Sequence, residues 1–414
     1  MRFYTGDESG LIKGIDIDAN VSLLEAQARA AKRTKAAAKA KATLKPTEQA
    51  PKPDTSIDGV NMWTVDGSVS RERSIQQLCA TLWSSGDRVL VAGRQNGNID
   101  VVGYDGQQLY TYANSEFSEK LSIKHNGRLI AGRQYVGLGA TDSQFLACTN
   151  MGEIRYQSFA TDEATLMKLP LDAFRMRTHR QRPSVFAVGG REHELSVWDA
   201  ETVKLEPQSG YAKPQSAPIF KAKNVPNDFL NLRVPVWVTD MQFTSDDATH
   251  PTIAVSTGHK QIRLYDTRAQ QRPVQDWEIS KHPILHLLAS HVRPELFFAD
   301  NMGNAHQMDM RTGLLTGTFK GISGAVKSLA LSEDGSKLAV AGLDRFVRVF
   351  ETEGMRQPLH RAYVKQRVSQ VLWDWDQKDL STEQLEEQEA EDIWESMDKA
   401  ALKKSTKRKA AAAS

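Results

Sequence analysis

Residues 184–201, SVFAVGGREHELSVWDAE, contain a short apolar strand, a glycine-bearing turn and a second strand that ends in Trp198-Asp199. The same pattern occurs six more times, each time as an apolar run, a polar turn and a segment of alternating apolar residues. These segments are LIKGID (11–16), NIDVVGYD (98–105), EIRYQS (153–158), QIRLYD (261–266), NAHQMD (304–309) and FVRVFE (346–351). A hairpin repeated at roughly 40 to 45 residues is typical of WD-type blades. We therefore predict an all-β, seven-bladed β-propeller over residues 1–373. Its second and third blades are expected to run from about Ile75 to Ala160, and the stretch 113–140 within them has no regular strand pattern.

The two ends of this propeller are expected to meet in one blade. Residues 2–18 supply two strands, RFYTG and LIKGIDI, with no strand before them. The segment RVSQVLW (367–373) follows the last complete blade and has no partner of its own. Pairing the two removes the open sheet edges that an unclosed propeller exposes. We predict that this C-terminal strand closes the ring.

A basic segment at 20–56 interrupts the first blade. It holds eight basic and three acidic residues, with Ala and Lys that favour a helix and three prolines that end it. It is either a solvated loop or a phosphate-binding arm that becomes ordered on nucleic acid. The candidate RNA-contacting residues are Arg29, Lys32, Arg33, Lys35, Lys39 and Lys41.

Residues 374–414 form a C-terminal tail that is first acidic and then basic. Its first part, 374–398, holds eleven acidic residues and one Lys, whereas 399–409 holds six basic residues and no acid. Ser381 and Gln384 form a capping box, which predicts a partly helical tail. The terminal run KKSTKRK resembles a nuclear localisation signal. Its candidate residues are Lys403, Lys404, Lys407, Arg408 and Lys409.

Composition argues against an enzyme. The chain has 414 residues and a net charge of +2, and most of the charge imbalance lies in the two arms. We therefore expect nucleic acid to be met by the arms rather than by a broadly basic propeller. Phosphate-loop, nucleophile-elbow, H-E-x-x-H and C-x-x-C motifs are all missing. We expect no catalytic residue, cofactor, metal or small-molecule substrate, and no apolar run is long enough to span a membrane.

Two residue pairs could suggest chemistry but have simpler interpretations. Cys79 and Cys148 lie in strand-like segments and are interpreted as small buried apolar residues. His282 and His286 lie in the β-like segment HPILHLL, where we interpret them as structural groups rather than metal ligands.

The fourth blade carries an insertion that ends in PIFKAKNVPNDFLNLRVPVWVTDMQF (218–243). Residues 236–243 alternate like an inner strand, and the loop before them is expected on the face where outer strands hand over to inner ones. Phe229 and Leu232 are three residues apart and could anchor a partner; alternatively they tuck beneath the ring and merely hold the loop. The partner-binding candidates are Lys221, Lys223, Asn224, Pro226, Asn227, Asp228, Phe229, Leu232 and Arg233.

The segment KAKNVPNDFLNLRVPVWVTDM (221–241) resembles the nucleolar WD-repeat ribosome-assembly factors of the Nop-seven-associated / WD-repeat protein seventy-four family. The opening MRFYTGDESGLIKGID and the acidic-then-basic tail are also similar to that family. The resemblance implies a non-catalytic scaffold on early nucleolar precursors of the large (60S) ribosomal subunit. It further implies support of pre-rRNA processing beside other assembly factors and pre-ribosomal RNA, and release by an AAA-type ATPase.

A second interpretation comes from two consecutive blades. Residues 265–268 (YDTR) and 308–311 (MDMR) end the same strand of their blades and resemble the W-D-x-R boxes of propellers that dock on the adaptor of cullin-type ubiquitin ligases. The alternative function is therefore a ligase substrate receptor. The structural explanation is that an acid and an Arg pair at a blade corner.

Overall fold

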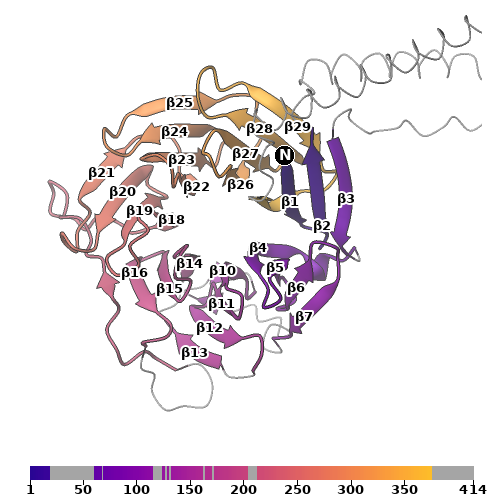
Figure 1. Ribbon diagram of the computed structural model, residues 1–414. Coiled ribbons are helices and arrows are strands. Elements are labelled where there is room, and N and C mark those ends of the chain that lie inside the picture. Colours follow the sequence, from indigo (N-terminus) through magenta and orange to yellow (C-terminus); the bar gives the residue numbers. More distant parts are fainter. Residues whose placement is uncertain are drawn as a thin grey trace, which may run out of the picture. The chain divides into compact units, whose positions relative to one another are not determined.

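The hairpin at 184–201 is present in the computed structural model. Strands β15 (Val185–Gly190) and β16 (His193–Asp199) pair antiparallel, with Phe186 opposite Trp198. The structure describes residues 1–18, 60–67, 69–114, 124–125, 128–129, 132–161, 164–169, 172–203 and 212–374. Within these ranges, seven four-stranded antiparallel sheets form the blades of a ring, which confirms the predicted propeller (Figure 1).

The four strands of each blade follow one another from the inner to the outer edge of the ring. The first three blades are β30 (Val368–Trp373), β1 (Arg2–Asp7), β2 (Ile12–Ile17), β3 (Val60–Asp66); β4 (Ile75–Leu82), β5 (Arg88–Arg94), β6 (Ile99–Gly103), β7 (Gln108–Tyr112); and β10 (Tyr135–Ala140), β11 (Gln144–Thr149), β12 (Glu153–Ser158), β13 (Ala164–Lys168). The fourth and fifth are β14 (Ala173–Thr178), β15, β16, β17 (Phe220–Lys221); and β18 (Val238–Phe243), β19 (Thr252–Thr257), β20 (Gln261–Asp266), β21 (Gln275–Glu278). The last two are β22 (Ile284–Ala289), β23 (Glu295–Asp300), β24 (Ala305–Asp309), β25 (Leu315–Phe319); and β26 (Val326–Leu331), β27 (Lys337–Gly342), β28 (Phe346–Glu351), β29 (Pro358–Tyr363).

The six repeat segments and the second strand of the 184–201 hairpin all occupy the third strand of their blades. The first blade contains both ends of the ring, because β1 pairs with β30 and places Phe3 opposite Trp373. The aromatic rings of Phe3 and Trp373 also meet edge to face, with their centroids 4.5 Å apart. The predicted closure by RVSQVLW is therefore confirmed, and the inner edge of the first blade is covered.

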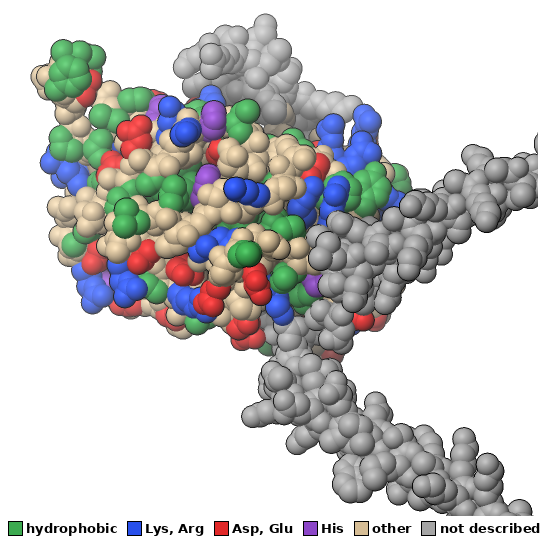
Figure 2. Space-filling model, turned by 90° about the horizontal axis from the view of Figure 1, so that it is seen from above, with side chains coloured by type: hydrophobic (Ala, Val, Ile, Leu, Met, Phe, Trp, Pro, Cys, Tyr) green, Lys and Arg blue, Asp and Glu red, His purple; other side chains and the backbone are tan. Residues whose placement is uncertain are grey.

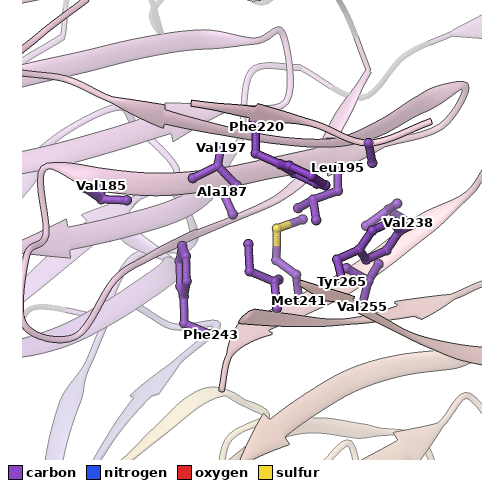
Figure 3. Packing of buried hydrophobic residues seen from close by; sticks show 12 residues of the cluster. Val185, Ala187, Leu195, Val197, Phe220, Val238, Met241, Phe243, Val255 and Tyr265 are labelled. Atoms are coloured by element: carbon purple, nitrogen blue, oxygen red, sulfur yellow. The ribbon is translucent and has the colours of Figure 1, made fainter. Parts of the chain in front are cut away.

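The core lies between neighbouring sheets rather than in one central mass. Between the fourth and fifth blades, Leu195 and Val197 of β16 pack with Phe220 of β17 against Met241 and Phe243 of β18 (Figure 3). Each sheet is thus buried by its neighbours, which is how a propeller adds blades without enlarging a single core.

The two cysteines fit an apolar role. Cys148 is buried in β11 and Cys79 is half-buried in β4, and both are free thiols. Burial raises the pKa of Cys79 to about 12, and burial followed by the charge of Glu153 raises the pKa of Cys148 further. Neither group is a thiolate at neutral pH, so neither is an activated nucleophile.

Three features differ from the sequence-based expectations. The outer strand of the fourth blade is Phe220–Lys221, which lies inside the segment that we assigned to the end of the insertion. The strand lies there because Phe220 packs into the core between the fourth and fifth blades. The third blade, expected to end near 160, extends to Lys168, since its outer strand has only one buried residue, Met167, and gives a weak pattern. In the irregular stretch 113–140, the inner strand β10 begins only at Tyr135, and β8 (Lys124–His125) pairs with β9 (Arg128–Leu129) separately.

Candidate docking surface

The connection between β17 and β18, residues 222–237, is fixed to the fourth blade at both of its ends. The Ala222 amide donates to the Leu195 carbonyl at 2.9 Å, and the Glu192 amide donates to the Val236 carbonyl at 3.0 Å. Ala222 and Val236 are both buried. We call this segment the β17–β18 loop. Because its ends are anchored, its tip projects from a defined place on the ring.

Trp237 holds the C-terminal end of the loop. The Arg191 guanidinium lies over its ring at 4.6 Å, and Phe174 and His259 meet the ring edge to face. A Cβ atom at Gly258 would lie 2.1 Å from the ring of Trp237, so only glycine leaves room for it. Trp237 was not among the predicted site residues, although its position beside the inner strand could have drawn attention to it.

The tip of the loop is closed by its own hydrogen bonds. The Asp228 Oδ1 atom accepts from the amides of Leu230 at 2.9 Å and Leu232 at 2.8 Å, and the Asp228 amide donates to the Leu232 carbonyl at 3.0 Å. Asn231 has a φ of 60°, a left-handed conformation that Asn tolerates better than most residues. These contacts pre-shape the tip as a turn through its own residues.

The apolar side chains of this tip face outward. Phe229 is 94% exposed, Leu230 63% and Leu232 59%. Figure 2 shows a projecting knob of hydrophobic side chains with an acidic group, on the side where Figure 1 draws β18 to β21. The alternative that Phe229 and Leu232 tuck beneath the ring does not fit these exposures. Leu230, which was not among the predicted site residues, belongs to the same apolar group.

The other predicted site residues of the loop either shape it, form an ion pair or are exposed. Asn224 donates from Nδ2 to the Val234 carbonyl at 2.7 Å and Asp228 caps the tip, so both shape the loop itself. Arg233 forms an ion pair with Glu192 at 3.0 Å, with both side chains mostly exposed. The remaining candidates, Lys221, Lys223, Pro226 and Asn227, are exposed. The loop therefore offers an apolar tip beside exposed cations.

The two arms lie outside the described residues. This applies to Arg29, Lys32, Arg33, Lys35, Lys39 and Lys41, and equally to Lys403, Lys404, Lys407, Arg408 and Lys409.

The inner strands contain a charged cluster that serves the framework. Arg177 forms two hydrogen bonds with the buried Asp240, at 3.1 and 3.0 Å, and Arg175 lies 3.5 Å from the same carboxylate. Burial favours the protonated acid, but Arg177 and Arg175 together hold the pKa of Asp240 below its ordinary value. Burial and the charge of Arg175 lower the pKa of the adjacent His286 to about 3. No three His, Cys, Asp or Glu side chains among the described residues are grouped to bind a metal.

The acid–arginine boxes form ordinary turns. Asp266 accepts from the Arg268 amide at 2.9 Å, and Asp309 accepts from the Arg311 amide at 2.8 Å. Asp199 makes the same contact with the Glu201 amide at 3.1 Å in a blade without the box arginine. The acid is thus explained by turn formation, which leaves the ligase interpretation without specific support from these turns.

In the described part of the chain, no helix is long and apolar enough to cross a membrane.

Comparison with known proteins agrees with the fold. The family model "WD domain, G-beta repeat" matches residues 313–351, which cover most of the seventh blade. "WD repeat-containing protein 74" of Homo sapiens is 26% identical over 372 residues, 84% of this chain and 88% of the relative. "Ribosome biogenesis protein NSA1" of Yarrowia lipolytica is 27% identical over 402 residues, 86% of this chain and 92% of the relative. The chain is therefore a WD-repeat propeller with homologues, over most of its length, named WD repeat-containing protein 74 and Ribosome biogenesis protein NSA1, and the resemblance inferred from its sequence is confirmed.

Proposed function

We propose that the chain is a non-catalytic scaffold in ribosome biogenesis that binds early nucleolar precursors of the large ribosomal subunit and supports pre-rRNA processing. The observation that carries this proposal is similarity over 86% of the chain to a relative named for ribosome biogenesis. The described residues add a rigid ring and an anchored, exposed loop, which suit a protein that holds other components in place. The proposed location is the nucleolus, with the basic run at 403–409 as nuclear localisation signal.

The β17–β18 loop is the proposed protein-docking surface. Phe229, Leu230 and Leu232 expose apolar area that a partner can bury, which favours binding by about 25 cal/mol per Å² before the costs of association. The hydrogen bonds of Asp228 hold these side chains in place before the partner arrives. A pre-shaped tip loses less conformational entropy on binding than a flexible one. Lys223 is exposed on the same loop and favours a partner that carries acidic groups around its apolar pocket, whereas Arg233 is already paired with Glu192.

Two elements of the proposal rest on the sequence: RNA contact on the basic charge of residues 20–56, and release by an ATPase on the resemblance alone. The basic segment at 20–56 contacts pre-ribosomal RNA, and an AAA-type ATPase removes the protein from the particle. The dependence on ATP can be tested in cell extract. If a non-hydrolysable ATP analogue leaves the tagged chain on large precursors while ATP releases it, the ATPase step is supported. Equal release under both conditions contradicts it.

Sedimentation tests the proposed function itself. A tagged copy of the chain is expected to comigrate with large-subunit precursors on a gradient and to retain their proteins after a salt wash. Recovery of the chain only in light fractions contradicts the proposal. Recovery of a cullin adaptor in place of ribosomal precursor proteins would instead support the ligase alternative.

A further inference from the structure

The face of the ring that carries the β17–β18 loop also carries a series of exposed cations. In an antiparallel blade, the turn between the second and third strands and the connection from the outer strand to the next inner strand lie at the same end. We call this end the loop face. Backbone contacts join the two kinds of connection, as when the Val364 amide donates to the Arg345 carbonyl at 2.9 Å and the Ser280 amide donates to the Lys260 carbonyl at 3.4 Å.

Six turns of this face share one backbone geometry. In each, a residue with positive φ donates its amide to the carbonyl three residues earlier. Four of these residues are glycines, namely Gly10, Gly97, Gly152 and Gly303, with φ between 75° and 93°. The other two are Lys260, with a φ of 71°, and Arg345, with a φ of 67°. A third cation, Lys365, has a φ of 70° in the connection from β29 to β30.

A left-handed conformation is unfavourable for a residue with a Cβ, whereas glycine adopts it freely. The fold tolerates glycine at this position in four turns, so the framework does not call for Lys260 or Arg345. Strained backbone in a native structure often marks a functional position. Two acids of this face, Asp172 and Glu192, also have positive φ, and they lie at the third and fourth blades. By contrast, Lys260, Arg345 and Lys365 carry positive charge to exposed turns at or beside the fifth and seventh blades.

These cations are not neutralised by the part of the chain that the structure describes. Lys260, Arg345 and Lys365 are exposed, and none forms an ion pair with a described residue. Lys281 and Lys320 lie exposed on the neighbouring connections of the fifth and sixth blades. Two acids of this face are engaged, whereas Asp172 is exposed. Asp344 pairs with Arg348 at 2.6 Å and Glu192 pairs with Arg233 at 3.0 Å.

We propose that Lys260, Lys281, Lys320, Arg345 and Lys365 form an arc that binds the phosphate backbone of RNA without reading its bases. Single cations on turns of successive blades suit a polyanion whose charge repeats along its length, and Lys and Arg supply such backbone contacts. A small net charge does not exclude a local arc of cations, because local charge clusters create their own potential. The identity of the RNA rests on the proposed function, whereas the arc itself does not.

The test uses the purified full chain and a short unstructured single-stranded RNA, with affinity measured between about 50 and 200 mM salt. The triple variant Lys260→Gln, Arg345→Gln and Lys365→Gln removes three cations from the loop face. The matched control is Arg268→Gln, Arg272→Gln and Arg311→Gln, which removes three exposed cations from turns of the opposite face. The slope of log affinity against log salt is expected to fall by about 0.7 per lost contact, hence by about 2, in the first variant only.

A second variant separates binding from structure. Lys260→Gly with Arg345→Gly relieves the left-handed backbone, so the expected result is an unchanged or higher melting temperature together with weaker RNA binding. An unchanged salt slope in the triple variant, or an equal change in the control, overturns the proposal. Loss of binding to a poly-glutamate peptide with RNA binding intact would assign the arc to an acidic protein instead. Normal sedimentation with precursors alongside a failed RNA test would contradict the arc and leave the proposed function standing.

Discussion

The first blade and the β17–β18 loop differ in which side chains they bury: charged groups are buried at the first blade, and apolar groups are exposed in the loop. Arg94 of the second blade is fully buried and binds the carboxylates of Asp66, in the first blade, and Asp100, in its own blade. This buried charge cluster joins the two blades. In the loop, Phe229 and Leu232 stand exposed on a turn that closes itself. The difference teaches that the groups that hold the ring together are separate from those offered to a partner. Stability and docking should therefore be alterable independently.

The largest expected effect comes from opening the first blade. Truncation after Lys365 removes β30 and uncovers the edge of β1, whereas truncation after Asp374 retains the strand. Val368 and Val371 are both buried, and each contributes roughly 1.5 to 3 kcal/mol. We expect the longer chain to melt cooperatively and the shorter one to lose its cooperative transition in a thermal melt. Equal melting temperatures for the two would refute closure as a requirement of the fold.

A smaller but substantial effect is expected at Arg94. After the substitution Arg94→Met, the cation that remains beside Asp66 and Asp100 among the described residues is the more distant Arg73, at 3.3 and 3.4 Å. Removing one partner of a buried ion pair costs about 3 to 5 kcal/mol, and Arg73 favours the lower end of that range. The control is Arg2→Met, because its pair with Asp16 is about one-third exposed and should contribute less than about 1 kcal/mol. Urea unfolding measures both, and similar losses would show that burial of the Arg94 cluster is unimportant.

Low pH should lower the folding stability of the propeller through His286. Burial and Arg175 lower the pKa of His286 to about 3, from 6.5 without these surroundings. As pH falls from 6.5, the unfolded chain takes up a proton that the folded chain does not, so stability present above pH 6.5 is lost toward pH 3. His286→Gln should make this loss shallower in unfolding experiments, whereas His282→Gln serves as the comparison. An identical pH profile for His286→Gln and the unchanged chain would contradict the role of His286.

The repeat in the sequence was sufficient for the ring because each blade follows the same local rule, an apolar strand followed by a turn and an alternating strand. The closing strand was predictable for a related reason, since RVSQVLW had no partner of its own. Other features depend on contacts between distant residues. Nothing near Arg94 indicates that Asp66 and Asp100 surround it, and a single inserted side chain, Phe220, decides where β17 lies. Lys260 and Arg345 were missed because their turns resemble polar loops until φ is known.

The candidate loop was placed correctly between an outer and an inner strand, but the roles within it were only partly predictable. Asp228 was assigned to a partner, yet its carboxylate is occupied by the amides of Leu230 and Leu232. A change at Asp228 would therefore alter the shape of the tip as well as its charge. The side chains that can be changed without disturbing the tip are the exposed apolar ones.

The most direct test of docking by the β17–β18 loop is sedimentation of the double variant Phe229→Ser with Leu232→Ser. Its control is Val292→Ser with Leu314→Ser, which removes two side chains that are 57% and 67% exposed on turns of the opposite face. Both variants should unfold within about 0.5 kcal/mol of the unchanged chain, because exposed substitutions rarely cost more. We predict that the loop variant leaves the large-subunit precursor fractions while the control remains in them. Retention of the loop variant in those fractions would contradict docking through this loop.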